Sequence, residues 1–319
     1  FDPEILEKLA SKNDARLGMI HTALVNLSDT MKKNWCNVGM YHGKPKAVFE
    51  YLTEKHKISK VITNRDYEPY AHKRDLEIET LLSQKGIKFE TYKDQVIFEK
   101  SEVVKEDGSS YKVYTPYSKK WLARMNSEGI PNFPSEDHLD NLAQVKQPQL
   151  SLEELGFEQP SISYPEFKFN GKIISEYEAT RNFPALDQTS RTGSHLRFGT
   201  LSVRKMALKA SKDKNNTFLK ELIWREFFMQ ILWHFPHSAT KCFKPQYENI
   251  QWRNNEEEFK KWCAGQTGYP FVDAGMRELN ATGFMHNRVR MLVGSFLFKH
   301  LLIDWRWGEA YFAEKLLDY

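Results

Sequence analysis

The stretch ELIWREFFMQILWHF, residues 221–235, has helical character and apolar side chains on nearly every side, as a buried helix does. At about 100° per residue, Glu221 and Arg225 fall on one side of this helix with Trp224. We expect the solvated polar groups on another side, that of Glu226, Gln230 and His234. Glu221 and Arg225 are four residues apart, so they either pair with each other or form part of a site.

The composition is that of a globular protein. The chain has 319 residues, of which 40% are hydrophobic and 28% charged, enough for two domains with their own cores. No apolar run is long enough to span a bilayer and the first residues do not resemble a signal peptide, so we expect a cytoplasmic protein with no membrane partner. The three cysteines are far apart and have no metal-ligand spacing, so we expect free thiols and no metal site.

The charge is unevenly distributed. From residue 166 onward there are 23 Lys and Arg against 17 Asp and Glu, which gives +6, while the remainder has 23 and 25, which gives −2. The same C-terminal part holds six of the eight tryptophans. Positive charge among aromatic residues suits a nucleic acid or a nucleotide cofactor, although a well-packed helical domain with a mildly basic surface would look the same.

Residues 1–130 alternate between helix and strand patterns. We predict helices over 17–31, 47–52 and 70–84, the last one ended by Gly86, and strands over 36–45, 60–64 and 87–92. Repeated β-α-β units predict a parallel sheet with helices on both faces, which is a Rossmann-like α/β domain.

The remainder of the chain has a different pattern. Residues 131–165 contain five of the thirteen prolines and no sustained period, which indicates a linker. Residues 166–319 show helical patterns joined by short turns, so we predict an all-α second domain.

One loop of the second domain has a composition that suits phosphate. TSRTGSHLRFGTLS, residues 189–202, places hydroxyl groups, the Arg191 guanidinium and the flexible Gly193 within five residues of each other. Such groups can satisfy phosphate oxygens at the start of a helix. The alternative is an ordinary N-capped turn, which serine and threonine form routinely.

A second helix carries polar residues in an apolar setting. Within MHNRVRM, Asn287, Arg290 and Met291 are expected on one side and Arg288 on another. Polar groups in an apolar helix are costly unless partnered, so they belong either to a satisfied core network or to a site. Trp252 and Trp305 are core residues unless a redox-active group lies nearby.

Six motifs occur in a characteristic order: RDYEPYAHKRD, VYTPYSKKW, TSRTGSHLRFGTLS, ELIWREF, QTGYPFVDAGMRELNATGFMHNRVRM and LLIDWRWGE. Together they resemble the photolyase/cryptochrome family along essentially the whole chain, and most of all its members that repair cyclobutane pyrimidine dimers. The resemblance implies an antenna-type α/β domain over 1–130, a linker over 131–165 and a helical FAD-binding catalytic domain over 166–319.

The resemblance also implies an activity. Such an enzyme is a carbon–carbon lyase that uses light and reduced FAD to transfer an electron to a dimer, which is flipped out of double-stranded DNA and then splits. Two alternatives stay open: a cryptochrome-type blue-light photoreceptor that binds FAD without repair, and a nucleic-acid-binding protein that holds no flavin.

Residue roles follow from the resemblance. It implies catalytic contacts to the lesion at Glu221, Trp224 and Met291. It implies FAD contacts at Tyr177, Thr189, Ser190, Arg191, Thr192, Gly193, Phe218, Arg225, Arg290 and Asp318, although the family often has tryptophan at position 218. DNA contacts are implied at Arg181, Asn287 and Arg288, in addition to Glu221 and Trp224. Electron transfer toward the flavin is implied at Trp252 and Trp305.

Two further expectations concern the ends of the chain and a second chromophore. Relative to the family pattern, the sequence begins late, at FDPEIL, and ends early, at LLDY, so we expect family segments beyond both ends. Tyr70 and Ala71 stand where folate-binding members tend to carry Asn-Glu, so a folate antenna is disfavoured, while a flavin-type antenna or none stays open. We expect a monomer.

Overall fold

The chain forms two compact units in a computed structural model that describes residues 1–32, 35–162 and 166–319. The first unit comprises Phe1–Glu7, Met40–Asn141 and Leu201–Glu248, and the second comprises Lys8–Gly39, Leu142–Thr200 and Asn249–Tyr319. Each unit therefore draws on both of the predicted domains. The division at residues 130 and 165 stays a prediction, and residues 163–165 of the predicted linker lie outside the described residues.

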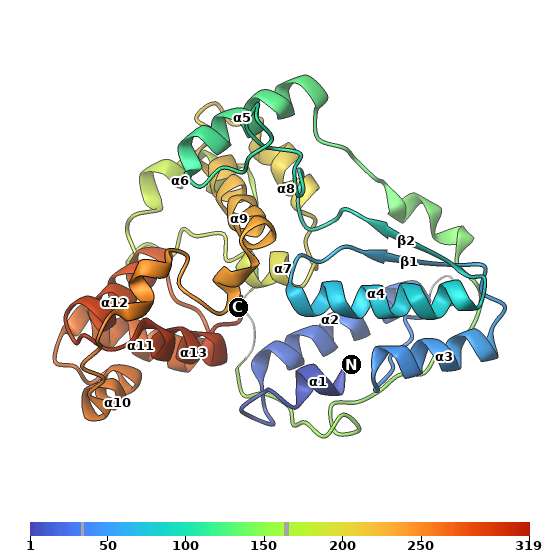
Figure 1. The fold of residues 1–319 in the computed structure, drawn as a ribbon, viewed down its shortest axis with the longest axis horizontal. Helices are drawn as coiled ribbons and strands as arrows, with labels where there is room; N and C mark the ends of the chain where they lie inside the picture. The colour runs from blue at the N-terminus through green and yellow to red at the C-terminus, as the bar shows by residue number, and fades with distance from the viewer. Residues whose placement is uncertain (33–34, 163–165) are drawn as a thin grey trace. The chain divides into compact units, whose positions relative to one another are not determined.

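The first unit contains the two strands that the described residues form and helix α4, which contacts one of them. Its elements, in chain order, are α1 (Pro3–Leu6), α3 (Pro45–Lys55), β1 (Lys60–Asn64), α4 (Pro69–Gln84), β2 (Lys88–Tyr92), α5 (Tyr114–Glu128), η2 (Ser135–Asn141), α8 (Val203–Ala210), α9 (Thr217–His234) and η3 (Pro236–Ala239), with η4 (Pro245–Asn249) at its end. β1 and β2 are parallel, with Lys60 opposite Lys88. α4 contacts β2, and α3 contacts α4 (Figure 1).

The predicted helices and two of the three predicted strands are present. α4 ends as expected, because Gly86 adopts a φ of +69° and the Ile87 amide donates back to the Leu82 carbonyl. The predicted strand over 36–45 is wrong: residues 36–44 form no strand. A strand needs a neighbouring strand to bond its backbone. Here the Val38 amide donates instead to the Ser28 hydroxyl of α2 (Ala15–Met31).

The second unit is helical. Its helices are α2, α6 (Gly171–Thr180), α7 (Gly193–Arg197), α10 (Glu256–Ala264), α11 (Pro270–Thr282), α12 (Asn287–Lys299) and α13 (Trp305–Lys315), and no strand follows residue 166 in the part of the chain that the structure describes. α10 to α13 lie close together (Figure 1) and pack around a core that includes the fully buried side chains of Trp262, Met276 and Val293. α11 and α12 approach closely at Gly275, where an added Cβ would lie 2.4 Å from Val289 Cγ1.

α9 is the central helix of the first unit and contacts both α5 and α8 (Figure 1). Its buried side includes Glu226 and Gln230, which are only 3% and 4% exposed, whereas Phe228 is 61% exposed. The expectation that Glu226, Gln230 and His234 form the solvated side is therefore wrong. The Nε2 atoms of His234 and Gln230 find partners in distant segments: His234 bonds to the Lys100 carbonyl and Gln230 donates to the Tyr111 carbonyl.

Candidate functional site

The predicted site residues divide between the two units. Phe218, Glu221, Trp224 and Arg225 lie on α9 in the first unit. All the others belong to the second unit: Tyr177, Arg181, Thr189, Ser190, Arg191, Thr192, Gly193, Trp252, Asn287, Arg288, Arg290, Met291, Trp305 and Asp318. That both groups line one pocket stays a prediction.

An aromatic row lies along the accessible side of α9. The ring of Trp224 stacks on Tyr114 of α5, with centroids 3.6 Å apart and planes 5° from parallel. Phe228 follows one turn along the helix, at 5.6 Å and 26° from Trp224. Glu221 is half-buried and lies within about 60° of Trp224 around the helix axis. A flat aromatic surface with a neighbouring acceptor is suited to stacking and bonding a nucleobase.

The other two α9 residues lie deeper. Arg225 donates from Nη1 to the carbonyl oxygen of Gln95, in the segment that follows β2. Phe218 is 4% exposed and packs in the interior at the start of α9. Phe218 is thus a core side chain of the first unit, whatever further contact it makes.

In the second unit the loop 189–193 is held in a defined shape. The Ser190 and Thr192 hydroxyls bond to each other at 2.9 Å, and the Ser190 carbonyl accepts from the Lys168 amide at 2.7 Å. Arg191 adopts a φ of +52°, an uncommon conformation for a side chain of its size. Thr192 is the N-cap residue of α7 but makes no side-chain capping bond, so capping does not account for this hydroxyl.

This loop meets α12 and the end of the chain. Gly193 lies against Asp318 so closely that a Cβ at this position would be 2.7 Å from Asp318 Oδ2. The same carboxylate oxygen accepts from Arg290 Nη2 of α12 at 3.2 Å. The Arg191 guanidinium lies 5.0 Å above the ring of Phe284 in the turn before α12. The loop, Arg290 and Asp318 therefore form one polar cluster.

Several atoms of this cluster and one atom of the neighbouring His286, the N-cap residue of α12, are buried without a hydrogen-bond partner. They are Arg191 Nε, His286 Nε2, Arg290 Nε and Asp318 Oδ1, within the described residues. Burial, with a smaller contribution from Arg288, lowers the pKa of His286. An unsatisfied buried polar group costs about 1–3 kcal/mol, so a ligand with both donors and acceptors would stabilise the cluster. The isoalloxazine ring, ribityl chain and diphosphate of FAD supply such groups, and the residues present fit this cofactor.

The start of α12 carries a second cluster of predicted residues. Arg288 donates from Nε to Asn182 Oδ1 at 2.8 Å and from Nη1 to Met291 Sδ at 3.5 Å. Asn287 also reaches Met291 Sδ, at 3.8 Å, and Met291 is 57% exposed. The expectation that Arg288 is turned away from Met291 is wrong, since positions three apart on a helix are neighbours.

The remaining predicted residues lie at the edges of the second unit. The Arg181 guanidinium stands 5.7 Å above the ring of Tyr177, at the end of α6. Trp252 precedes α10 and Trp305 begins α13, and both are half-buried. The backbone beside Trp252 is tied to the backbone before Trp305, because the Arg253 amide donates to the Leu302 carbonyl at 2.8 Å.

A hollow opens beside the Arg288–Met291 cluster. It has a volume of about 620 Å³ and lies between the start of α11 and α12. Exposed apolar side chains line it, among them Tyr269, Phe271 and Met291.

No helix in the described part of the chain is both long and apolar enough to cross a membrane.

The sequence did not predict the roles of two side chains, Tyr114, which packs against α9, and Glu226, which lies on α9. Tyr114, which stacks on Trp224, lies in the quoted motif VYTPYSKKW, and its position there was the available signal. Glu226 was taken for a solvated residue, and its partners lie more than a hundred residues away in the sequence. No local pattern identifies such partners.

Comparison with known proteins assigns the family. Residues 1–136 match the family model described as DNA photolyase, and residues 218–319 match the one described as the FAD binding domain of DNA photolyase. A deoxyribodipyrimidine photo-lyase of Halobacterium salinarum is 33% identical over 343 aligned residues, which cover all of this chain and 70% of that protein. The chain therefore belongs to the photolyase/cryptochrome family.

Solved structures agree with this assignment. A class III photolyase from Agrobacterium tumefaciens matches 98% of this chain and 69% of its own, with a TM-score of 0.81 and 28% identity. An archaeal photolyase from Sulfolobus tokodaii, described with two FAD molecules, matches all of this chain and 72% of its own, with a TM-score of 0.77 and 29% identity. The resemblance inferred from the motifs is confirmed.

Proposed function

We propose that this protein is a deoxyribodipyrimidine photo-lyase, which splits cyclobutane pyrimidine dimers in DNA in a light-dependent reaction. The observation that carries this proposal is the aromatic row of α9 with Glu221 beside it, in a chain whose curated relatives are named for this activity. A flipped-out dimer presents flat faces to such a row and imide N–H and C=O groups to a neighbouring side chain. Reduced FAD, when bound, would supply the electron that opens the cyclobutane ring.

The residues of this chain would perform distinct parts of the task. The loop 189–193, with Arg290 and Asp318, would hold the cofactor, since its buried polar atoms lack other partners within the described residues. Trp224 would stack against the dimer while Glu221 accepts a hydrogen bond from it. Phe218, Arg225 and Tyr177 would make further cofactor contacts.

The second set of contacts concerns the DNA and the supply of electrons. Arg181, Asn287 and Arg288 would bind the DNA around the extruded dimer, and Met291 would lie at the lesion. Trp252 and Trp305 would carry electrons inward.

A second chromophore is compatible with this function, and a folate is disfavoured. Ala71 is 4% exposed and offers no polar side-chain group. The Tyr70 hydroxyl already donates to the Asp2 carboxylate. Neither position supplies a free carboxylate or amide for a pterin.

The test uses flavin-loaded, reduced protein and an oligonucleotide with a single thymine dimer. We expect loss of the dimer under blue light and none in the dark, with an undamaged duplex as the binding control. A flavin-containing sample that leaves the dimer intact under light would contradict repair and favour a photoreceptor. A preparation without flavin absorbance would contradict the cofactor assignment itself.

A further inference from the structure

α9 carries large apolar side chains on nearly every side, so an apolar side by itself does not fix the orientation of this helix in the first unit. Leu219, Leu222 and Ile223 are buried, yet Phe228 on another side is 61% exposed and Trp224 is half-buried. Burial of apolar surface is non-directional, so turning α9 about its own axis would exchange one set of large apolar side chains for another. Directional contacts must therefore select which side faces the interior.

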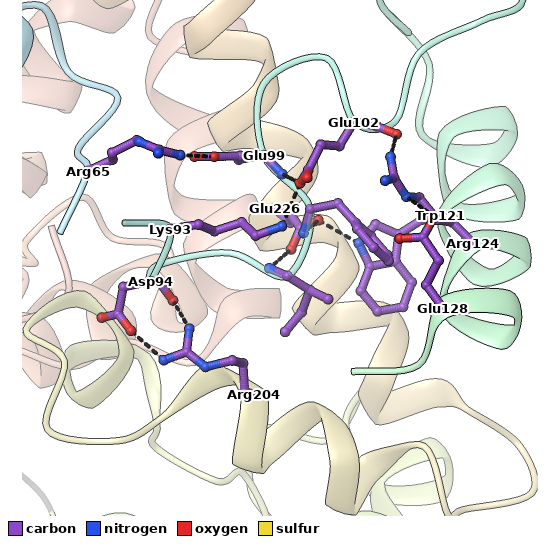
Figure 2. A network of polar contacts seen from close by, with 12 residues as sticks. Arg65, Lys93, Asp94, Glu99, Glu102, Trp121, Arg124, Glu128, Arg204 and Glu226 are labelled. Atoms are coloured by element: carbon purple, nitrogen blue, oxygen red, sulfur yellow. Dashed lines mark hydrogen bonds and ion pairs between the residues drawn. The ribbon is translucent and has the colours of Figure 1, made fainter. Parts of the chain in front are cut away.

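Glu226 supplies contacts of this kind. Its Oε2 accepts from the Ile97 amide at 2.6 Å and its Oε1 from the Phe98 amide at 2.9 Å. Oε1 also accepts from Trp121 Nε1 at 2.5 Å and from the Tyr117 hydroxyl at 3.4 Å, both on α5. Figure 2 shows the carboxylate between the loop that follows β2 and the Trp121 side chain. Two separate segments thus hold one side chain of α9.

The loop that bonds Glu226 is itself fixed. Asp94 pairs with Arg204 of α8 at 2.5 Å, and Glu99 pairs with Arg65 beyond β1 (Figure 2). Further along, the Lys93 ammonium pairs with Glu102 at 2.7 Å. Because these ion pairs hold the loop in place, the bonds from the loop to the Glu226 side chain also restrain α9.

The side opposite Glu226 is the one that carries the aromatic row. At about 100° per residue, Trp224 and Phe228 both lie about 160° from Glu226 around the axis. A rotation of α9 by about half a turn would release Glu226 and turn the rings of Trp224 and Phe228 toward the interior. Arg225, which bonds to the Gln95 carbonyl of the same loop, resists the same rotation.

We propose that Glu226 is a positioning residue whose bonds to Ile97, Phe98 and Trp121 set the rotation of α9 and thereby direct its aromatic row outward. The consequence for lesion recognition rests on the proposed function, whereas the rotation itself does not. Removing this carboxylate leaves its four donors without an acceptor, at a cost of about 1–3 kcal/mol for each buried group that stays unsatisfied. Loss of stability alone therefore does not reveal the orienting role, and the test must report the rotation itself.

The rotation can be measured by thiol labelling, without reference to activity. Phe228→Cys places a thiol at an exposed position, and Ile223→Cys places one at a position that is 0% exposed. With Glu226 present, we expect a thiol-reactive reagent to modify Phe228→Cys about 100-fold faster than Ile223→Cys. The reason is that a buried thiol reacts only when the structure around it opens locally. The background is the chain with its three native cysteines alone.

Glu226→Leu places an apolar side chain of similar size at position 226 and removes both carboxylate oxygens that accept the hydrogen bonds. We expect it to reduce the ratio of the two labelling rates about tenfold or more, since the helix loses its preferred rotation. Should this variant not fold, Glu226→Gln carries the same comparison, because its amide turns an NH₂ group toward the loop donors. An unchanged ratio in a folded variant overturns the proposal.

A matched control separates Glu226 from the loop it binds. Glu99→Gln weakens one of the ion pairs that fix this loop and leaves all four bonds of Glu226 in place, so it should lower the labelling ratio much less than the Glu226 variants do. A Glu99→Gln variant that lowers the ratio as much as the Glu226 variants would assign the rotation to the loop and overturn the proposal.

The link to recognition has its own readout. In Glu226→Gln we expect the preference for dimer-containing over undamaged duplex to fall about tenfold while flavin content is unchanged, which corresponds to about 1.4 kcal/mol. An unchanged preference overturns the link to recognition. A parent chain that shows no such preference refutes the proposed function instead, and the labelling ratio still decides the rotation.

Discussion

The stability of the first unit should depend on pH through Glu226. Burial is the largest influence on this carboxyl and raises its pKa from the ordinary 4.5 to about 7, although the bonds from Ile97, Trp121 and Phe98 each lower it. The positive charge of Arg225 on the same helix also lowers the pKa.

The sign and size of the effect follow from linkage. The folded state binds the proton more tightly than the unfolded state, so the stabilisation is fully present below about pH 4.5 and is lost as the pH rises through about 7. One pKa unit corresponds to about 1.4 kcal/mol, so the whole change amounts to about 3 kcal/mol. Most of this change, about 2–3 kcal/mol, falls between about pH 5 and pH 8.

The measurement is the urea unfolding of the parent and of Glu226→Gln at these two pH values. Glutamine does not titrate, so the parent should lose about 2–3 kcal/mol relative to the variant between pH 5 and pH 8. The difference between the two proteins is the informative quantity, because His286, whose pKa burial lowers, changes stability in the opposite direction as the pH falls below its ordinary 6.5.

Glu102→Gln is the matched control for this experiment. Bonds from Lys93 and the Glu99 amide outweigh burial and lower the pKa of Glu102, so it titrates below 4.5 and its contribution is constant between pH 5 and pH 8. A parent and a Glu226→Gln variant that differ by the same amount at both pH values would refute the reasoning about burial.

Three further predictions concern the two units. Glu221→Ala should weaken binding of dimer-containing DNA by about 1–3 kcal/mol with flavin retained, because a lesion amide loses its acceptor; equal weakening on undamaged duplex in the same titration would argue against a lesion contact. Gly193→Ala would force a methyl group within 2.7 Å of Asp318 Oδ2 and should lower the flavin-to-protein absorbance ratio of the purified protein. A variant with the flavin content of the parent would show that the contact between Gly193 and Asp318 is not part of the cofactor site. Gly275→Ala should destabilise the chain by about 1–3 kcal/mol in urea, since its Cβ would collide with Val289, and a change within about 0.5 kcal/mol would show that α11 and α12 adjust freely.

Local patterns predicted the local structure well. The helix that became α4 has helical periodicity and a terminating Gly86, and the strands on either side of it are short and rich in β-formers. The strand expected over residues 36–45 did not form, because pairing depends on a neighbouring strand that no local pattern specifies. The two strands found among the described residues make a smaller sheet than the alternating pattern suggested.

The site was predicted unevenly for a related reason. Motif order identified the family, and the structure brings Gly193, Arg290 and Asp318 together although up to 125 residues separate them in the sequence. Their meeting could be inferred from the resemblance but not from spacing. The carboxylate of Glu226 was assigned to solvent because polar residues usually lie at the surface, and its four donors come from segments that fold against α9 from far along the chain.

Residue type therefore misleads in a helix like α9, and the physical reason is general. Where apolar residues surround a helix, a carboxylate can be the better anchor, because hydrogen bonds have direction and the hydrophobic effect has none. The same anchoring leaves Phe228 61% exposed and Trp224 half-buried, although each would gain about 25 cal/mol for every Å² of apolar surface removed from water. A fold that fixes polar side chains inward and holds aromatic rings outward forgoes that gain unless something else covers the rings. A nucleobase with two apolar faces is a ligand of the kind that would recover it.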